Sequence, residues 1–139
     1  MSTLRLTLPL PPGVNNQYVT VGKRRVLSKD ARAFNKQVAA VARALHMRED
    51  TETLLPALQA KPFACDLVFY FETPFKRDLD GGLKIALDAV CGGLGLDDRF
   101  VVSITLEKRI DPLRPRLEME IGPAEGWRFD REYVVLDPE

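Results

Sequence analysis

Four acidic side chains fall into two short groups on either side of one predicted helix. Asp78 and Asp80 stand one residue apart, and Asp97 and Asp98 are adjacent further along the chain. Carboxylates held close together repel each other unless a proton or a cation lies between them. A hard divalent ion such as Mg²⁺ takes carboxylate oxygens and keeps several of its waters. The spacing therefore makes the acid pairs a candidate metal site.

A second interpretation of the first acid pair is purely structural. Asp80 could serve as the N-cap of the helix that follows, with Asp78 as a solvated neighbour. Basic residues surround the pair, with Lys76 and Arg77 before it and Lys84 four residues after Asp80. Asp80, Lys84 and Asp88 recur every four residues and so share one helical face. These neighbours favour chemistry at the pair without excluding the capping role.

The remaining reactive residue types limit the chemistry to carboxylates, lysine and a metal. His46 is the only histidine, which argues against histidine-ligated zinc and against a histidine-based nucleophile system. Cys65 and Cys91 belong to no Cys-x-x-Cys pair. Both fall in apolar surroundings, so we expect them to be small buried residues.

Length and composition indicate one compact domain. The chain has 139 residues, of which 45% are hydrophobic and 29% charged, as is usual for a globular protein with its own core. No apolar run approaches membrane-spanning length, and the first residues lack the layout of a signal peptide. We therefore expect a cytoplasmic protein that makes no contact with a membrane.

The formal net charge of zero conceals an uneven distribution. Residues 1–48 carry nine basic side chains against one acidic, whereas residues 117–139 carry seven acidic against two basic. A basic N-terminal part could therefore face nucleic acid although the total charge is balanced. A charged surface that is merely solvated is the alternative.

Apolar periodicity predicts the elements that must position these residues. Strands are expected at residues 4–10, 63–71, 100–110 and 117–121, and a short hairpin at 18–27 with Lys23, Arg24 and Arg25 at its tip. One helix should follow the N-cap Ser28, and a second should run from about Asp80 to Cys91 and end at Gly92 and Gly93. Residues 48–61 are interpreted as a connection. In the strand at 100–110, the side chains expected to point inward are Val102, Ile104, Leu106 and Ile110.

This order predicts a single-domain α/β (α+β) fold in which two main helices pack on a small mixed β-sheet. The relative direction of the strands at 63–71 and 100–110 decides where the acids lie. If these strands are parallel, the two acid pairs lie at opposite ends of the intervening helix. If they are antiparallel, the pairs could converge.

Several motifs together resemble the RusA family of Holliday junction resolvases, which are mostly of phage or prophage origin. The similarity covers roughly residues 3–121 and rests on these motifs in order: Pro11-Pro12-Gly13-Val14-Asn15-Asn16-Gln17-Tyr18, Arg77-Asp78-Leu79-Asp80, Lys84 and Leu96-Asp97-Asp98. The resemblance implies a RusA-like nuclease domain over residues 1–121, followed by an acidic tail at 122–139. Where the family commonly has Asn after the second Asp, this chain has Gly81 and Gly82.

The resemblance also implies an activity, a cofactor and site residues. It implies a homodimer that cuts four-way or other branched DNA with Mg²⁺, or with Mn²⁺ in its place. The implied metal ligands are Asp78, Asp80 and Asp98, with Lys84 as a further catalytic residue. Whether Asp97 or Asp88 assists is left open. The residues expected to contact DNA are Asn15, Asn16, Lys23, Arg24, Arg25, Lys76 and Arg77.

Two other functions remain as alternatives. The chain could be a branched-DNA-binding protein that has lost catalysis, with its acids kept for folding or weak metal binding. It could also be a nucleotide-sugar transferase, because such enzymes use an Asp-x-Asp pair, although the chain is short for that class. The aromatic residues of the tail, Trp127, Phe129 and Tyr133 to Leu136, are expected to dock, for example on a partner subunit.

Overall fold

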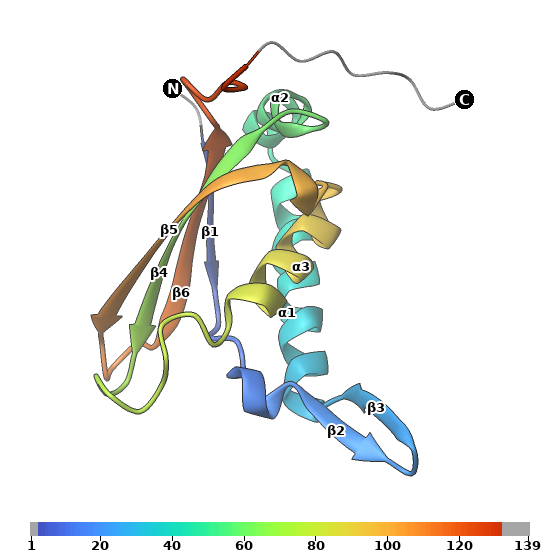
Figure 1. Ribbon diagram of the computed structural model, residues 1–139, viewed down its shortest axis with the longest axis vertical. Helices are drawn as coiled ribbons and strands as arrows, with labels where there is room; N and C mark the ends of the chain where they lie inside the picture. The colour runs from blue at the N-terminus through green and yellow to red at the C-terminus, as the bar shows by residue number, and fades with distance from the viewer. Residues whose placement is uncertain (1–2, 132–139) are drawn as a thin grey trace.

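A computed structural model describes residues 3–131 of the chain. One face of a four-stranded sheet is covered by helices, and a separate two-stranded hairpin projects from one end of the molecule (Figure 1). The elements in chain order are β1 (Leu4–Leu8), the 3-10 turn η1 (Val14–Asn16), β2 (Tyr18–Val21), β3 (Arg24–Leu27), α1 (Lys29–His46), α2 (Glu49–Leu58), β4 (Phe63–Phe71), α3 (Leu83–Leu94), the 3-10 turn η2 (Asp98–Phe100), β5 (Val101–Ile110) and β6 (Arg116–Pro123).

The sheet is mixed, as the sequence predicts, with the strand order β1-β6-β4-β5. Strand β6 is antiparallel to both β1 and β4, whereas β4 and β5 are parallel. A parallel pair needs a crossover connection, and α3 supplies it. The sequence left open whether the two acid pairs converge. The parallel direction of β4 and β5 decides this, because it places the acid pair before α3 and the acid pair after α3 at opposite ends of that helix.

The alternating strands bury one face of the sheet under the helices. Every second residue of β4 is buried, from Phe63 through Cys65, Leu67 and Phe69 to Phe71. The core face of α1 includes Phe34, Val38 and Leu45, as the helical periodicity predicts. Ser28 caps α1, since its side chain accepts a hydrogen bond from the backbone N–H of Ala31 at 3.1 Å.

Residues 48–61, interpreted from the sequence as a connection, contain the helix α2. Its buried side chains are Thr51, Leu55 and Leu58, which close one end of the core. The helix was missed because Pro56 lies within it and breaks the usual helical pattern. A proline inside a helix removes one backbone hydrogen bond, and α2 ends two residues after it, at Leu58.

The boundaries predicted for the second helix were wrong at both ends. Helix α3 begins at Leu83, not near Asp80, and continues through Gly92 and Gly93 to Leu94. It ends at Gly95, whose φ of 69° is left-handed and whose N–H bonds to the carbonyl of Cys91. Glycine suits this position because other residues rarely adopt that conformation.

The inward positions predicted for β5 were only partly right. Val102 and Leu106 are half-buried, but Ile104 and Ile110 remain 38% and 41% exposed. The reason is that β5 lies at the edge of the sheet, where the helix layer covers the inward face less completely than it covers the central strand β4. A sequence pattern identifies the face of a strand but not its place in the sheet.

Both cysteines are buried and unpaired, as expected. Burial raises the pKa of Cys65 to about 12. Burial, followed by the negative charges of Asp98, Asp88 and Asp97, raises the pKa of Cys91 to about 11. Both thiols therefore stay protonated at neutral pH and are poor nucleophiles. Among the described residues, no helix combines the length and apolar character needed to cross a membrane.

Candidate active site

Two loops that are far apart in the sequence meet at one end of the sheet and are joined through Gln17. This side chain is buried, and its amide nitrogen donates to the carbonyl oxygens of Pro12 and Gly81, each at 3.0 Å. A buried amide with both hydrogen bonds made holds the two backbones at a defined separation. The loop that begins at Pro11 is thereby held against the loop that carries the first acid pair.

Gly82 allows these loops to approach more closely than any other residue type would. A Cβ atom placed on Gly82 would lie 2.3 Å from Cγ of Pro11, well inside contact distance. Gly82 is therefore part of the packing between the loops, whereas a Cβ atom on Gly81 would meet its nearest neighbour at 3.6 Å, an ordinary contact. Gly82 also occupies the N-cap position of α3, without a capping side chain.

Arg77 is held in place from two sides. Its guanidinium donates to the carbonyl of Pro11 and lies over the ring of Phe71 at 5.1 Å. Burial lowers the pKa of Arg77 from its usual value, but arginine remains charged throughout the physiological range. The position of this charge beside the acid pair is therefore well defined.

The predicted residues of both loops line one open cavity. Asn15 and Asn16 come from η1, and Lys76, Arg77 and Asp78 come from the loop after β4. The structure thus brings together five of the residues that the sequence assigns to DNA binding or catalysis. Asp30, which no sequence argument singled out, lies on the same wall.

Asp78 and Asp80 are exposed, and neither caps α3. The N-cap is Gly82, and no side chain makes a capping hydrogen bond there. The backbone carbonyls of both aspartates instead accept turn hydrogen bonds, from Gly81 N at 3.4 Å and Leu83 N at 3.1 Å. The capping interpretation of Asp80 is therefore wrong, and its carboxylate is left available to solvent or a ligand.

The opposite end of α3 carries the second acid pair. Asp97 caps η2 by accepting from Arg99 N at 3.0 Å, and its carboxylate forms an ion pair with Arg99 at 2.7 Å. These bonds to Arg99 hold the pKa of Asp97 below its usual value. Asp98 has no such partner among residues 3–131 and faces a shallow hollow shared with Asp88 and Cys91. Asp97 therefore has a structural role at the start of η2, whereas the carboxylate of Asp98 is available to a ligand.

Lys84 lies between the two acid pairs on the exposed side of α3. Its ammonium group donates to Asp88 at 2.9 Å. This hydrogen bond is the main cause that raises the pKa of Lys84, and the charge of Asp98 adds to it. Lys84 therefore carries a full positive charge at neutral pH. The pairing of Lys84 with Asp88 confirms that these two share one helical face, whereas the same prediction was wrong for Asp80, which precedes α3.

The three proposed metal ligands do not form one cluster within a single chain. Asp78 and Asp80 precede α3, whereas Asp98 follows it and lies against Asp88 in the middle of the helix. Within residues 3–131, no group of three or more acidic, histidine or cysteine side chains is placed to hold a metal. The assignment of these aspartates to a metal remains a prediction.

The basic hairpin stands apart from the cavity. Lys23, Arg24 and Arg25 are exposed on the β2–β3 ribbon, which extends away from the sheet (Figure 1). Arg25 lies over the ring of Tyr18 at 4.6 Å, which stiffens the ribbon. Any contact of these residues with DNA would therefore be at a distance from the acids.

Two residues that organise the site were missed by sequence reasoning. Gln17 was treated only as part of a motif, because a polar residue in a loop gives no sign that it is buried. Lys108 donates to the carbonyls of Pro74 and Arg77 at 3.0 and 2.9 Å. A signal did exist for Lys108, since it interrupts the inward apolar alternation of β5.

Comparison with known proteins gives a consistent result. The family model described as Endodeoxyribonuclease RusA matches residues 9–122. The chain is 30% identical over 122 residues to the crossover junction endodeoxyribonuclease RusA of Escherichia coli strain K12, and the match covers 87% of this chain and 95% of that relative. It is 29% identical, with the same coverage, to the protein of that name from Enterobacteria phage 82.

Proposed function

The chain belongs to the RusA family of endodeoxyribonucleases, and from this premise we propose that it resolves four-way and other branched DNA by paired cuts that require Mg²⁺. The observation that carries the proposal is the cavity where η1 meets the loop after β4. There an exposed carboxylate, Asp78, lies beside two cationic side chains, Lys76 and Arg77, and two asparagines. Such a wall provides donors for phosphate oxygens next to a ligand for a hard cation.

The carboxylates of Asp78, Asp80 and Asp98 suit a hard divalent ion, because such ions prefer oxygen ligands. When bound there, Mg²⁺ or Mn²⁺ would supply Lewis-acid polarisation of the phosphate and a more acidic water. The chain's own contribution is positional. Arg77 would hold the phosphate backbone, and the charged Lys84 would stabilise negative charge that develops on the phosphate.

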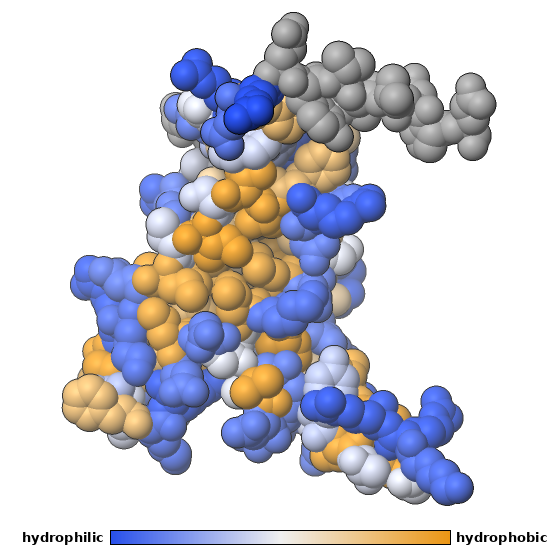
Figure 2. Space-filling view, viewed as in Figure 1, coloured by the Kyte–Doolittle hydropathy of each residue, from blue (hydrophilic) through white to orange (hydrophobic). Residues whose placement is uncertain are grey.

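We propose that Asp98 reaches the first acid pair from a second copy of the chain. The crossover through α3 separates the pairs within one chain, whereas a two-fold axis beside α3 would place Asp98 of one subunit near Asp78 and Asp80 of the other. Apolar side chains gather over the face between β5 and α3 (Figure 2). That face includes the exposed Ile104 and the half-buried Leu83, Leu87 and Leu106, which a second copy could cover.

The direct test is cleavage of a synthetic four-way junction by the purified protein. We expect two symmetrically related cuts in Mg²⁺, slower or comparable cutting in Mn²⁺, and none after removal of divalent ions with EDTA. Tight binding without any cutting in Mg²⁺ or Mn²⁺ would instead support the alternative of an inactive branched-DNA-binding protein. Equal cutting with and without EDTA would contradict the metal requirement.

The hairpin is expected to contribute affinity and not chemistry. Replacing Lys23, Arg24 and Arg25 together with Gln should weaken junction binding and reduce the slope of log affinity against log salt by about one unit for each phosphate that the protein no longer neutralises. Titrations at several salt concentrations measure this slope. The matched control is a triple replacement of Lys29, Arg32 and Lys36, which are exposed on α1. An unchanged slope for the hairpin variant would show that this ribbon does not contact phosphates.

A further inference from the structure

The two most exposed large apolar side chains among the described residues lie at one end of the sheet. Phe75 is 94% exposed in the loop after β4, and Leu113 is 96% exposed in the turn between β5 and β6. Because β4 and β5 are parallel and β6 returns beside β4, both connections leave the sheet at the same end (Figure 1). Single exposed apolar residues are common, but here two lie in loops at the same end of the sheet, where β5 also ends at the exposed Ile110. We refer to these three residues as the apolar patch.

The loop that carries Phe75 is fixed to the end of β5. The ammonium group of Lys108 donates to the carbonyl oxygens on either side of Phe75, at Pro74 and Arg77. The backbone N–H of Asp111 bonds to the carbonyl of Phe71 at 2.8 Å. The loop is therefore held where it presents Phe75 to solvent, so little ordering is needed when a ligand arrives.

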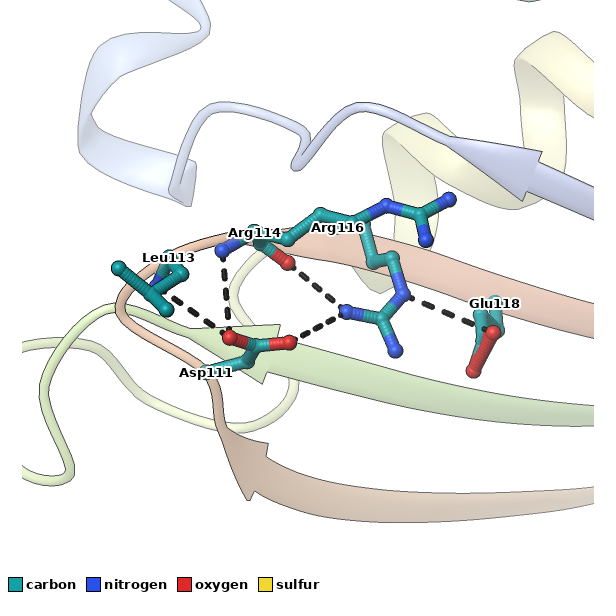
Figure 3. A network of polar contacts seen from close by, with 5 residues as sticks. All are labelled: Asp111, Leu113, Arg114, Arg116 and Glu118. Carbon is teal, nitrogen blue, oxygen red and sulfur yellow. Dashed lines mark hydrogen bonds and ion pairs between the residues drawn. The ribbon is translucent and has the colours of Figure 1, made fainter.

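The turn that carries Leu113 is fixed in a similar way (Figure 3). Asp111 Oδ1 accepts from the backbone N–H groups of Leu113 and Arg114, each at 3.2 Å. Asp111 Oδ2 accepts from Arg116 at 2.8 Å, and the same guanidinium nitrogen donates to the carbonyl of Arg114. The guanidinium carbon of Arg116 lies 3.7 Å from the centre of the Tyr70 ring. The Leu113 side chain takes no part in this network. The network holds the backbone of the turn in a conformation that leaves this side chain exposed to solvent.

A cation that has no side-chain partner within residues 3–131 adjoins each apolar tip. Lys76 follows Phe75, and Arg114 follows Leu113. Neither side chain forms an ion pair or hydrogen bond within the described part of the chain, whereas Arg116 and Arg109 are both occupied by acids. Free cations beside exposed apolar groups match a ligand that offers phosphates next to apolar ring faces, which describes DNA.

We propose that Phe75 and Leu113 form a wedge that enters the branch point of a DNA junction and stacks against the bases there, while Lys76 and Arg114 hold the adjoining phosphates. Apolar side chains that enter between bases unstack them and bend the helix. In the open form of a four-way junction the stacking is interrupted at the exchange point, so opening the bases there costs less than opening a duplex. The wedge thereby selects branched DNA over duplex, a property that the acids and the basic hairpin do not supply. The inference rests on the proposed function.

The test uses Asp80→Asn protein, so that binding is measured without cutting, and junctions carrying 2-aminopurine at the branch point. Binding of this protein should raise the 2-aminopurine emission, because the base becomes unstacked. Adding Phe75→Ser and Leu113→Ser should remove that rise and lower the preference for junction over duplex by about tenfold for each side chain. Duplex affinity should change little, because the phosphate contacts remain. The matched control is Met47→Ser, which replaces a similarly exposed apolar residue after α1.

Each outcome has a distinct meaning. An unchanged emission rise and an unchanged preference in the double variant would overturn the wedge while leaving the proposed nuclease intact. A drop in molecular mass by light scattering, with the preference kept, would show that the patch is an interface between copies and would also overturn it. Failure of the otherwise wild-type protein to bind or cut a junction would count against the proposed function itself. Circular dichroism and melting of each variant establish that it is folded.

Discussion

Asp80→Asn should abolish junction cleavage and leave the fold and junction binding nearly intact. The substitution keeps the shape of the side chain but removes the charge that a divalent ion requires. Loss of one preorganised electrostatic contact in an active site lowers the rate by about 10²–10³-fold, and loss of a metal ligand should have at least that effect. Single-turnover cleavage of a labelled junction in Mg²⁺ measures it.

The structure explains why stability should be spared. Asp80 is exposed, its side chain forms no hydrogen bond or ion pair with residues 3–131, and the N-cap of α3 is Gly82. Surface substitutions of this kind change the free energy of unfolding by less than about 0.5 kcal/mol. Asp50→Asn, in an exposed carboxylate of α2 that pairs with Arg48 at 2.7 Å, is the control for loss of a surface carboxylate and should cut at the wild-type rate. Full cleavage by Asp80→Asn would remove this residue from the metal site.

Mixing two inactive variants should restore cutting if the site forms between subunits. Asp80→Asn and Asp98→Asn are each expected to be inactive as homodimers. A mixed dimer contains two sites, each of which takes Asp80 from one subunit and Asp98 from the other. One of these sites has both native aspartates, and the other has neither. Cutting should therefore return on one strand, to a nicked product. If each site lay within a single chain, both sites of the mixed dimer would be defective and no cutting would return.

The experiment needs a measured assembly state. Light scattering at micromolar concentration should give twice the chain mass for both variants and for their mixture, and the subunits must be allowed to exchange before the assay. A mixture of Asp80→Asn with Asp78→Asn serves as the control. These acids belong to the same loop, so no site of that mixed dimer is complete and no activity should return. A monomeric mass together with paired cutting would contradict the composite site.

Periodicity predicted most of the fold because the strands bury one face. The alternation from Phe63 to Phe71 and the stripe of α1 each match the face that the structure buries. Local patterns could not place β5 at the edge of the sheet, since edge position depends on which other strands pair with it. They also missed α2, where a proline lies inside a helix, and the two ends of α3, where glycines carry no periodic signal.

The candidate site was predictable in its residue types and less so in its arrangement. The cavity does join Asn15, Asn16, Lys76, Arg77 and Asp78. Whether the two acid pairs converge depends on the relative direction of β4 and β5. No local sequence pattern specifies that direction. Gln17 and Lys108 act through hydrogen bonds to carbonyl oxygens, and such partners are known only once the loops are in place.

The position of β6 determines when the nuclease can first exist during synthesis. This strand lies between β1 and β4 in the sheet, yet it is the last of the three to leave the ribosome. Leu4 pairs with Ile121, so β1 has no neighbouring strand until nearly the whole domain is made. Contacts so distant in sequence slow folding. The loop that follows β1 forms one wall of the cavity, so we expect this wall to be fixed only after β6 has joined the sheet.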